Sequence, residues 1–343
     1  MSFWEITIIA LIKIIILLAI LFLFAAYLVY FERKISAWVQ NRIGPNRVGY
    51  RGLLQSFADV IKLLVKEDIV PTVANKPLHT IAPIIALFVA FSTYAVIPFG
   101  PTINIFGYSI ELIVANVNIG ILYILALTSL SVYAITFAGW SSGSKYSLLG
   151  GIRSSAQMIS YEVSMGFSVA GVILLAQSLK PMDIVNSQYG WMWNAIIQPI
   201  GFITFVVSAF AETNRLPFDL PEAEPELVGG YHTEYSSMKF AGFFLAEYAN
   251  MFMASALIVT LYLGGWQVPY IDKIGLNQTL TVIIQVAAFF VKAIFIMFVF
   301  IWVRWSIPRF RYDQLMNLGW KVMFPLSLLN VIWVAVLIMI FGI

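Results

Sequence analysis

The stretch 6-ITIIALIKIIILLAILFLFAAYLVY-30 decides the fold class of this chain. An α-helix needs about 20 apolar residues to cross a bilayer core about 30 Å thick, and this stretch exceeds that length with a single charge, Lys13. It is too long for a secretory signal, and no small-residue cleavage site follows it. We therefore expect a membrane-spanning helix that the protein retains.

The rest of the chain has the same character. Hydrophobic residues make up 61% of the 343 residues and charged residues 11%, compared with about 25% charged residues in an average soluble domain. The sequence therefore predicts an all-α polytopic membrane protein, residues 1–343 forming a single integral membrane domain with about eight transmembrane helices. The expected helices are 6–30, 78–99, 111–138, 160–178, 191–211, 241–263, 277–303 and 320–341.

Lysine and arginine are distributed very unevenly between alternate loops. One set of loops and their edges holds sixteen of them, eight in the first loop and eight in the rest, whereas the other set holds only Lys180 and Lys273. Positively charged loops stay on the cytoplasmic side of a membrane. We therefore expect both termini on the outer side, and loops 31–77, 139–159, 212–240 and 304–320 on the inner side.

The first inner loop, 31–77, contains the segment 52-GLLQSFADVIKLLVK-66. Its apolar residues recur at helical spacing and its polar residues fall on other faces, which predicts an amphipathic helix over 52–66 that is too short to span. Two interpretations stand. The helix lies in the membrane interface, or it also forms a wall of a cavity for an amphiphilic ligand.

The second inner loop, 212–240, is unusually acidic. The segment 211-AETNRLPFDLPEAEPELVGGYHTEY-235 holds six of the chain's seventeen carboxylates and one base, Arg215. Asp219 and Glu222 have the spacing of a helix capping box, and Pro225 interrupts any longer helix. The acids therefore sit on a short kinked element, which is either a solvated loop or the mouth of a path for protons.

Several ionisable residues fall within the expected spans. Glu162 begins the helix 160–178, Glu212 ends 191–211, Glu247 lies about two turns into 241–263, and Lys292 lies near the middle of 277–303. A charge in hydrocarbon costs at least about 2.5–3.5 kcal/mol, so such residues pair, face the bundle interior or line a water path. Lys13 is long enough to reach the interface. The three carboxylates all lie near inner ends, where convergence would let them share protons.

The chain has no cysteine and two histidines, His79 and His232. Thiolate-held iron–sulfur or metal centres therefore cannot form, and two histidines are too few for a haem or copper cluster. We predict no metal site and no bound cofactor in this chain, and we expect any redox centre to belong to a partner.

Four separated stretches together resemble one family, the H subunit of bacterial respiratory complex I, whose counterpart is the first mitochondrial NADH dehydrogenase membrane subunit. All four lie at expected inner positions in the family's order, so the resemblance covers essentially the whole chain. They are FERKISAWVQNRIGPNRVG (31–49), GWSSGSKYSLLGGIRSSAQMISYEV (139–163), AETNRLPFDLPEAEPELVGGYHTEYS (211–236) and RWSIPRFRYDQLMNLGWK (304–321).

The resemblance implies a subunit of the bacterial inner membrane that anchors a hydrophilic arm. It implies that the chain forms the membrane end of a quinone chamber and its entrance, with quinone as substrate. Flavin and iron–sulfur clusters would belong to partner subunits, and the partners would be the hydrophilic quinone-site subunits, small membrane subunits and membrane lipid, without nucleic acid. No covalent catalytic residue is implied.

The resemblance also assigns roles to residues, position by position. The implied proton path consists of Glu162, Glu212, Asp219, Glu222, Glu224, Glu226, Glu247 and Lys292. The implied quinone-binding residues are Arg33, Phe57, Asp59 and Arg215, and the implied arm-docking residues are Arg304, Arg309, Arg311 and Asp313.

Three alternative hypotheses remain open. The same type of subunit could serve a related complex fed by ferredoxin or reduced deazaflavin, because the donor binds elsewhere. A secondary transporter is disfavoured because no internal repeat is visible and the charges gather on one face. A purely structural anchor is disfavoured by Glu247 and Lys292, since an anchor has no need of costly intramembrane charges.

Overall fold

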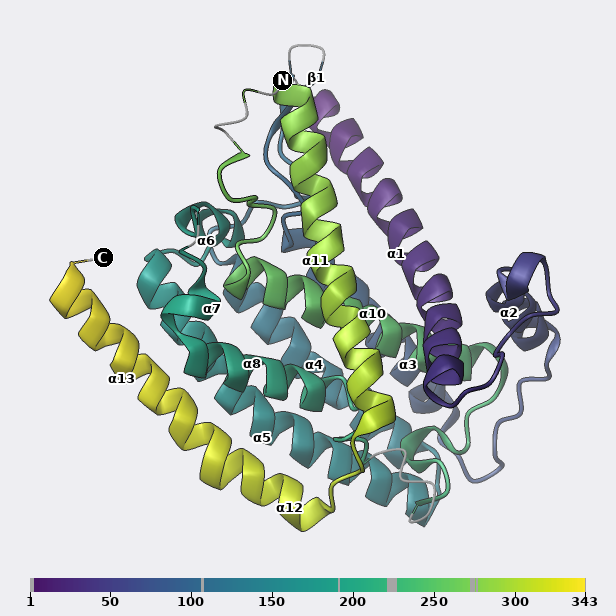
Figure 1. Cartoon of the computed structure of the whole chain (residues 1–343). Coiled ribbons are helices and arrows are strands. Elements are labelled where there is room, and N and C mark those ends of the chain that lie inside the picture. Colours follow the sequence, from purple (N-terminus) through teal and green to yellow (C-terminus); the bar gives the residue numbers. More distant parts are fainter. Residues whose placement is uncertain are drawn as a thin grey trace.

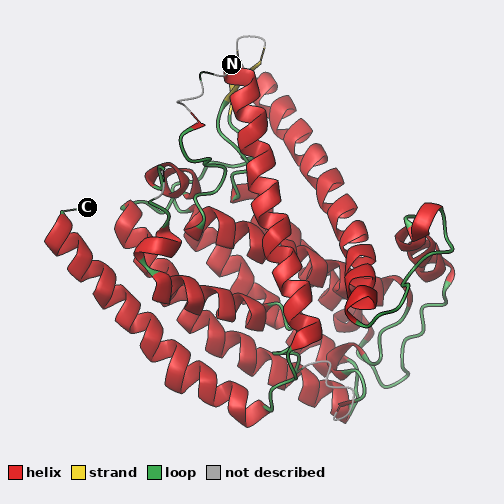
Figure 2. Ribbon diagram, viewed as in Figure 1, coloured by secondary structure: helices red, strands yellow, loops and turns green. Residues whose placement is uncertain are grey.

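The computed structural model describes residues 3–105, 108–190, 192–220, 227–271, 275 and 277–342, and it is mostly helical (Figures 1 and 2). Two short antiparallel strands form one hairpin near the N-terminus, β1 (Ile103–Ile105) and β2 (Tyr108–Ile110). The helices are α1 (Phe3–Val39), α2 (Gln55–Val65), α3 (Lys76–Ser92), α4 (Gly120–Ser141), α5 (Lys145–Ala176), α6 (Pro181–Ser187), α7 (Asn194–Ile197), α8 (Pro199–Glu212), α10 (Ser237–Tyr262), α11 (Gln278–Ser306), α12 (Tyr312–Asn317) and α13 (Phe324–Phe341).

Seven helical segments of the described residues are long and apolar enough to cross a membrane, which confirms a polytopic membrane protein. The expected helix 191–211 differs. It is split into α7 and α8 at Gln198–Pro199, because proline disfavours helical geometry in the residue before it and Gln198 has φ −129° and ψ 69°. The 14 residues of α8 reach only about 21 Å, less than a bilayer core.

Helix α5 begins at Lys145, well before the expected start at residue 160. Glu162 therefore lies in the middle of a 32-residue helix, and the expectation that it begins a helix is wrong. The first half of α5 is rich in serine and glycine, which lowers hydropathy without breaking the helix. Gly151 lets α5 approach α4 closely, since a Cβ there would lie 3.2 Å from the Ile135 carbonyl oxygen.

Helix α10 is the centre of the bundle. Within the most apolar stretch of α10, 78% of the residues are buried, whereas the corresponding stretches of α1 and of the α12–α13 segment are 11% and 17% buried. Figure 1 shows α1 and α13 at opposite edges, with α5, α8 and α10 between them. The basic loops meet at one end of the bundle, which we call the basic end. There the backbone amide of Asn75 donates a hydrogen bond to the Ser141 carbonyl, and the backbone amide of Phe310 donates one to the Pro217 carbonyl.

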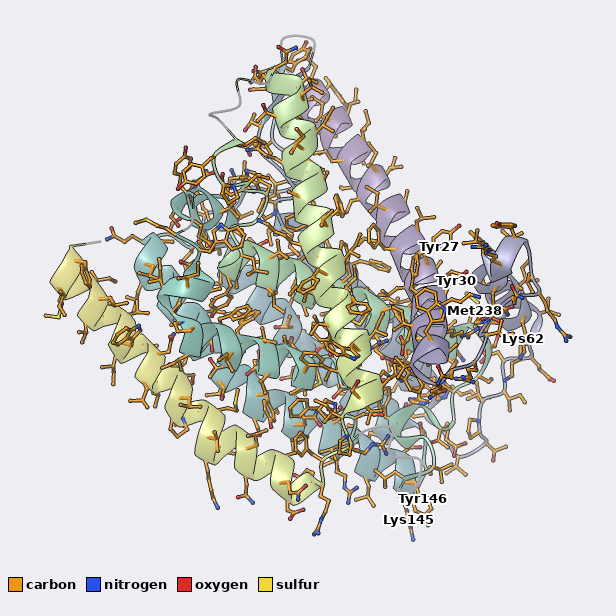
Figure 3. The ribbon with its side chains drawn as sticks, in the orientation of Figure 1. Tyr27, Tyr30, Lys62, Lys145, Tyr146 and Met238 are labelled. Atoms are coloured by element: carbon orange, nitrogen blue, oxygen red, sulfur yellow. The ribbon has the colours of Figure 1, made fainter. Side chains whose placement is uncertain are left out.

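Helix α2 occupies residues 55–65 of the expected 52–66 and contacts α1 and α10 at the basic end. Its Ser56 hydroxyl donates to the Ala26 carbonyl of α1 over 2.6 Å. Figure 3 shows Tyr27, Tyr30 and Lys62 on the side of the bundle where α2 lies. The apolar face of α2 is open, with Phe57, Val60, Ile61 and Leu64 all about half exposed.

Candidate functional site

Glu32, near the basic end of α1, is a buried carboxylate that three donors surround. It is 4% exposed and accepts hydrogen bonds from Arg215 Nη1 over 2.9 Å, Tyr248 Oη over 2.8 Å and Arg304 Nη1 over 2.5 Å. The donors come from the loop after α8, from α10 and from α11. Hydrogen bonds between charged groups are the stronger ones, and a buried charge needs such partners. The carboxylate therefore joins three segments that are far apart in the sequence.

Arg215 connects Glu32 to a second carboxylate. Its side chain is 1% exposed, and its Nε lies 2.9 Å from Glu247 Oε1. The guanidinium also lies 4.5 Å from the centre of the Tyr248 ring, within cation–π range. Burial alone lowers the pKa of Arg215, but Glu32 and Glu247 outweigh burial and raise the pKa well above its ordinary value. Arg215 is therefore a permanent cation between two carboxylates.

We call Glu32, Arg215, Glu247, Tyr248 and Arg304 the Glu32 cluster. Two acids face two guanidinium groups in it, so the charges of the ionised side chains balance. Removing one member of such a buried set is strongly destabilising, whereas the complete set is tolerated.

A cavity of about 40 Å³ lies beside the cluster. Glu247 and Glu212 both line it, together with Asn214, Asn250 and Ser131. A second cavity of about 10 Å³ shares Glu212, Asn250 and Ser131 with the first. A buried water needs at least about 10–15 Å³ and two to four polar partners, so these spaces suit a short row of waters. The first cavity thus borders both carboxylates.

Beyond the cavities lies the third predicted carboxylate. Glu162 of α5 accepts a hydrogen bond from the Ser129 hydroxyl of α4. Glu212 lies close enough to Glu162 to interact with it electrostatically. The structure therefore places Glu247, Glu212 and Glu162 near one another, Glu247 and Glu212 at one cavity and Glu162 beside Glu212.

Asp219 and the arginines of the last inner loop form a separate contact. Asp219 is buried and pairs with Arg309 over 3.0 Å, while Arg304 belongs to the Glu32 cluster. Arg311 and Asp313 face each other at the surface over 3.3 Å, with 76% and 60% of their side chains exposed. The side chains of Arg304 and Arg309 therefore bind carboxylates of this chain. The predicted path residues Glu222, Glu224 and Glu226 lie outside the described residues.

The predicted quinone-binding residues fall into two places. Arg33 of α1 and Asp59 of α2 pair over 2.6 Å, with about a third to a half of each side chain exposed. Phe57 of α2 is 47% exposed. Arg215, in contrast, lies inside the Glu32 cluster. Arg33 and Asp59 therefore fasten α2 to α1, and Phe57 belongs to the open apolar face.

Lys292 lies away from the carboxylates. Its ammonium donates to the carbonyls of Leu263, Gly265 and Gln267 over 2.8, 3.0 and 2.8 Å. These carbonyls follow the end of α10, about 24 Å along the helix axis from Glu247 at 1.5 Å per residue. Three donors on three carbonyls beyond a helix C-terminus form a cap. A role of Lys292 in the proton path stays a prediction.

Replacing Lys292 with methionine should lower the thermal stability of the purified protein, because three carbonyls lose their donor at about 1–3 kcal/mol for each group left unsatisfied. The measurement is the midpoint of thermal unfolding in detergent. The exposed Lys321→Met is the matched control, with an unchanged midpoint expected. An unchanged midpoint for Lys292→Met would contradict the capping role.

Sequence reasoning missed Glu32, Tyr248 and Asn250. Glu32 directly follows the apolar run of α1, where a carboxylate beside Arg33 reads as an interface residue. The signal that could have found it is the match of 31-FERK-34 to the family stretch. Asn250 is one helical turn after Glu247, so both residues face the same cavity.

Comparisons with known proteins identify the family of this chain. The family model described as NADH dehydrogenase matches residues 12–335. NADH-quinone oxidoreductase subunit 8 of Rhodothermus marinus is 54% identical over 93% of this chain and 94% of its own length. The H subunit of the Salinibacter ruber enzyme is 52% identical over 93% and 92%, and an H subunit of the Cytophaga hutchinsonii enzyme is 50% identical over 92% and 93%. The chain therefore belongs to the NADH dehydrogenase family, as an H subunit of NADH-quinone oxidoreductase.

Proposed function

We propose that this subunit forms the quinone entrance and the membrane end of the quinone chamber, and that it couples quinone reduction to proton translocation. The observation that carries the proposal is the Glu32 cluster, whose Glu247 lines the cavity that leads to Glu212. A permanent cation between the buried Glu32 and the partly buried Glu247 responds to a nearby change of charge, and the cavity gives protons a route away from it.

The proposed entrance lies between α1 and α2. The open apolar face of α2 suits the tail of a long-chain quinone, which stays in lipid-like surroundings there. Arg33, Phe57 and Asp59 lie at this entrance. The quinone head group continues toward the hydrophilic arm and is reduced there to quinol by electrons from partner subunits, which carry the flavin and the iron–sulfur clusters, and by protons taken up in the chamber.

Reduction of the quinone changes the charge and the demand for protons in the chamber. The ion pair of Arg215 with Glu32 and its ion pair with Glu247 then change in relative strength. Glu247 takes up or releases a proton through the waters of the cavity, Glu212 exchanges it, and Glu162 passes it toward an adjacent small membrane subunit. Asp219 lies at the mouth of this path at the basic end. Glu222, Glu224 and Glu226 are assigned to the same mouth, and Lys292 to the path, by the resemblance alone.

The proposed docking surface for the hydrophilic arm is the basic end. Arg311 and Asp313 are exposed there, and Arg304 and Arg309 hold the loop 213–220 in place from behind. In this arrangement the basic end faces the bacterial cytoplasm, and both termini lie on the outer side of the inner membrane.

Glu247→Gln tests the coupling. We expect the variant to assemble and to lose most NADH-driven proton pumping in inverted membrane vesicles, because glutamine cannot carry a proton. The measurements are the rate of quinone reduction and the quenching of a pH-sensitive dye. The exposed Glu67→Gln serves as the control. Wild-type reduction and pumping in Glu247→Gln would refute the proposed path.

A second experiment identifies the electron donor. The complex is purified in mild detergent through this chain, its subunits are identified by mass spectrometry, and NADH-driven quinone reduction is assayed. Flavin and iron–sulfur subunits with inhibitor-sensitive activity are expected. A different electron-input module would move this chain to a sister complex and leave the quinone and proton proposals standing.

A further inference from the structure

One glutamine of α5, Gln157, forms hydrogen bonds to both ends of the turn that carries the site residues. Gln157 is fully buried, and its Nε2 donates to the carbonyls of Ala211 and Phe218, both over 2.7 Å. A weaker contact of 3.3 Å runs from the same nitrogen to Asn214 Oδ1. A side-chain amide has two hydrogens, so the two short bonds use both of them. Gln157 therefore fixes the two ends of the turn 211–218 relative to each other.

The residues next to these acceptors are those of the proposed path. Glu212 follows Ala211, Asp219 follows Phe218, and Arg215 lies between them. The turn also contains a backbone conformation that needs support, since Asn214 has φ 51°. The Ser154 hydroxyl, one helical turn before Gln157, donates to Asn214 as well. The same face of α5 thus holds the turn at its beginning, its middle and its end.

We propose that Gln157 is a positioning residue for proton coupling, an inference that rests on the proposed function. It holds Glu212 toward the cavity while Arg215 faces Glu32 and Glu247. Because both groups belong to one turn whose two ends are held by the same side chain, a displacement of Arg215 reaches Glu212 through the backbone of that turn. Without Gln157 the two groups move independently, and the charge change at the cluster no longer sets the proton exchange at Glu212.

A second buried glutamine, Gln188, serves as a control that distinguishes this positioning role from a general contribution to helix packing. Gln188 is equally buried, at 1% exposure, and its Nε2 donates to the carbonyls of Ile184 and Thr260 over 3.1 and 3.0 Å. Its Oε1 accepts from the amides of Asn194 and Gly264. Gln188 lies at the far end of α10 from the Glu32 cluster. It is a matched control with at least as many hydrogen bonds to lose.

The experiment compares Gln157→Leu and Gln157→Glu with Gln188→Leu in the assembled complex. Leucine removes the donors, and glutamate directs carboxylate oxygens at two carbonyl oxygens. We expect both Gln157 variants to lower the ratio of protons pumped to electrons transferred and to shift the pH profile of quinone reduction. Coupled turnover should fall about 10- to 100-fold, because misplacement by about 1 Å can cost that much. Gln188→Leu should keep the wild-type ratio and profile.

Asn214→Gly provides a second variant in case the Gln157 variants do not assemble. Glycine keeps the positive φ and removes one acceptor of Gln157, so a smaller change in the same direction is expected. Wild-type ratio and pH profile in assembled Gln157→Leu, or in Asn214→Gly where Gln157→Leu fails to assemble, would overturn the inference. Equal changes in Gln188→Leu would also overturn it. Glu247→Gln, measured alongside, tells which proposal fails: if it is impaired while Gln157→Leu is normal, only the inference falls.

Discussion

Replacing Arg215 with methionine should prevent most of the complex from assembling. The side chain is 1% exposed and connects Glu32 with Glu247. Methionine fills the volume but leaves Glu247 without its ion-pair partner, while Arg304 still holds Glu32. Breaking a buried pair in this way costs about 3–5 kcal/mol, a large part of the stability of a typical domain. The measurement is the amount of assembled complex in membranes, together with its thermal midpoint.

Two further variants define the origin of that loss. Arg215→Met combined with Glu247→Gln should recover part of the assembled complex, because the second change removes the unpaired charge. Arg215→Lys should fall between the wild type and Arg215→Met, since lysine keeps the charge but cannot contact two carboxylates with a planar fork. Arg311→Met, with 76% of the arginine side chain exposed, should change little. No recovery in the double variant would show that the arginine acts through packing and not through its charge.

The sequence predicts the membrane helices well because hydropathy reports the solvent that surrounds them. It fails where polar residues are buried inside the bundle. The serine- and glycine-rich first half of α5 looks like a loop by hydropathy, yet its Gln157 and Ser154 are fully buried against the turn after α8. Likewise α7 and α8 look like one helix, because an apolar window does not register the effect of Pro199 on Gln198.

The carboxylates within the membrane helices can be predicted from the sequence, but the ion pairs of the candidate site cannot. Glu162, Glu212 and Glu247 were found because a carboxylate in an apolar stretch is costly, and costly residues stand out. Glu32 did not stand out, because it lies where a helix is expected to leave the membrane. Arg304 and Arg309 appear as docking residues in a basic loop, and only the three-dimensional structure shows that Glu32 and Asp219 take up their charges.

Glu212→Gln should abolish most coupled activity without loss of assembly. Glu212 lines both cavities and forms no ion pair with a described residue. Replacing it with glutamine, which has the same shape, therefore leaves no described charged group without its ion-pair partner. Glutamine preserves the shape and the hydrogen-bonding capacity but cannot exchange a proton. Because proton transfer by a positioned group contributes about 10²–10⁴-fold, we expect coupled NADH-driven proton pumping to fall by about 10²-fold. Pumping is measured by dye quenching in inverted vesicles, with Glu111→Gln as the control.

The comparison of Glu212→Gln with Glu247→Gln separates a proton carrier from a charge partner. Glu247→Gln also deprives Arg215 of one carboxylate, so its thermal midpoint should fall, whereas the midpoint of Glu212→Gln should stay at the wild-type value. Normal pumping in Glu212→Gln, combined with a loss in Glu247→Gln, would mean that the cavity does not carry the proton and that Glu247 acts through Arg215 alone. A loss in both variants, with a lowered midpoint in only one, is the result that a path from the Glu32 cluster through the cavity requires.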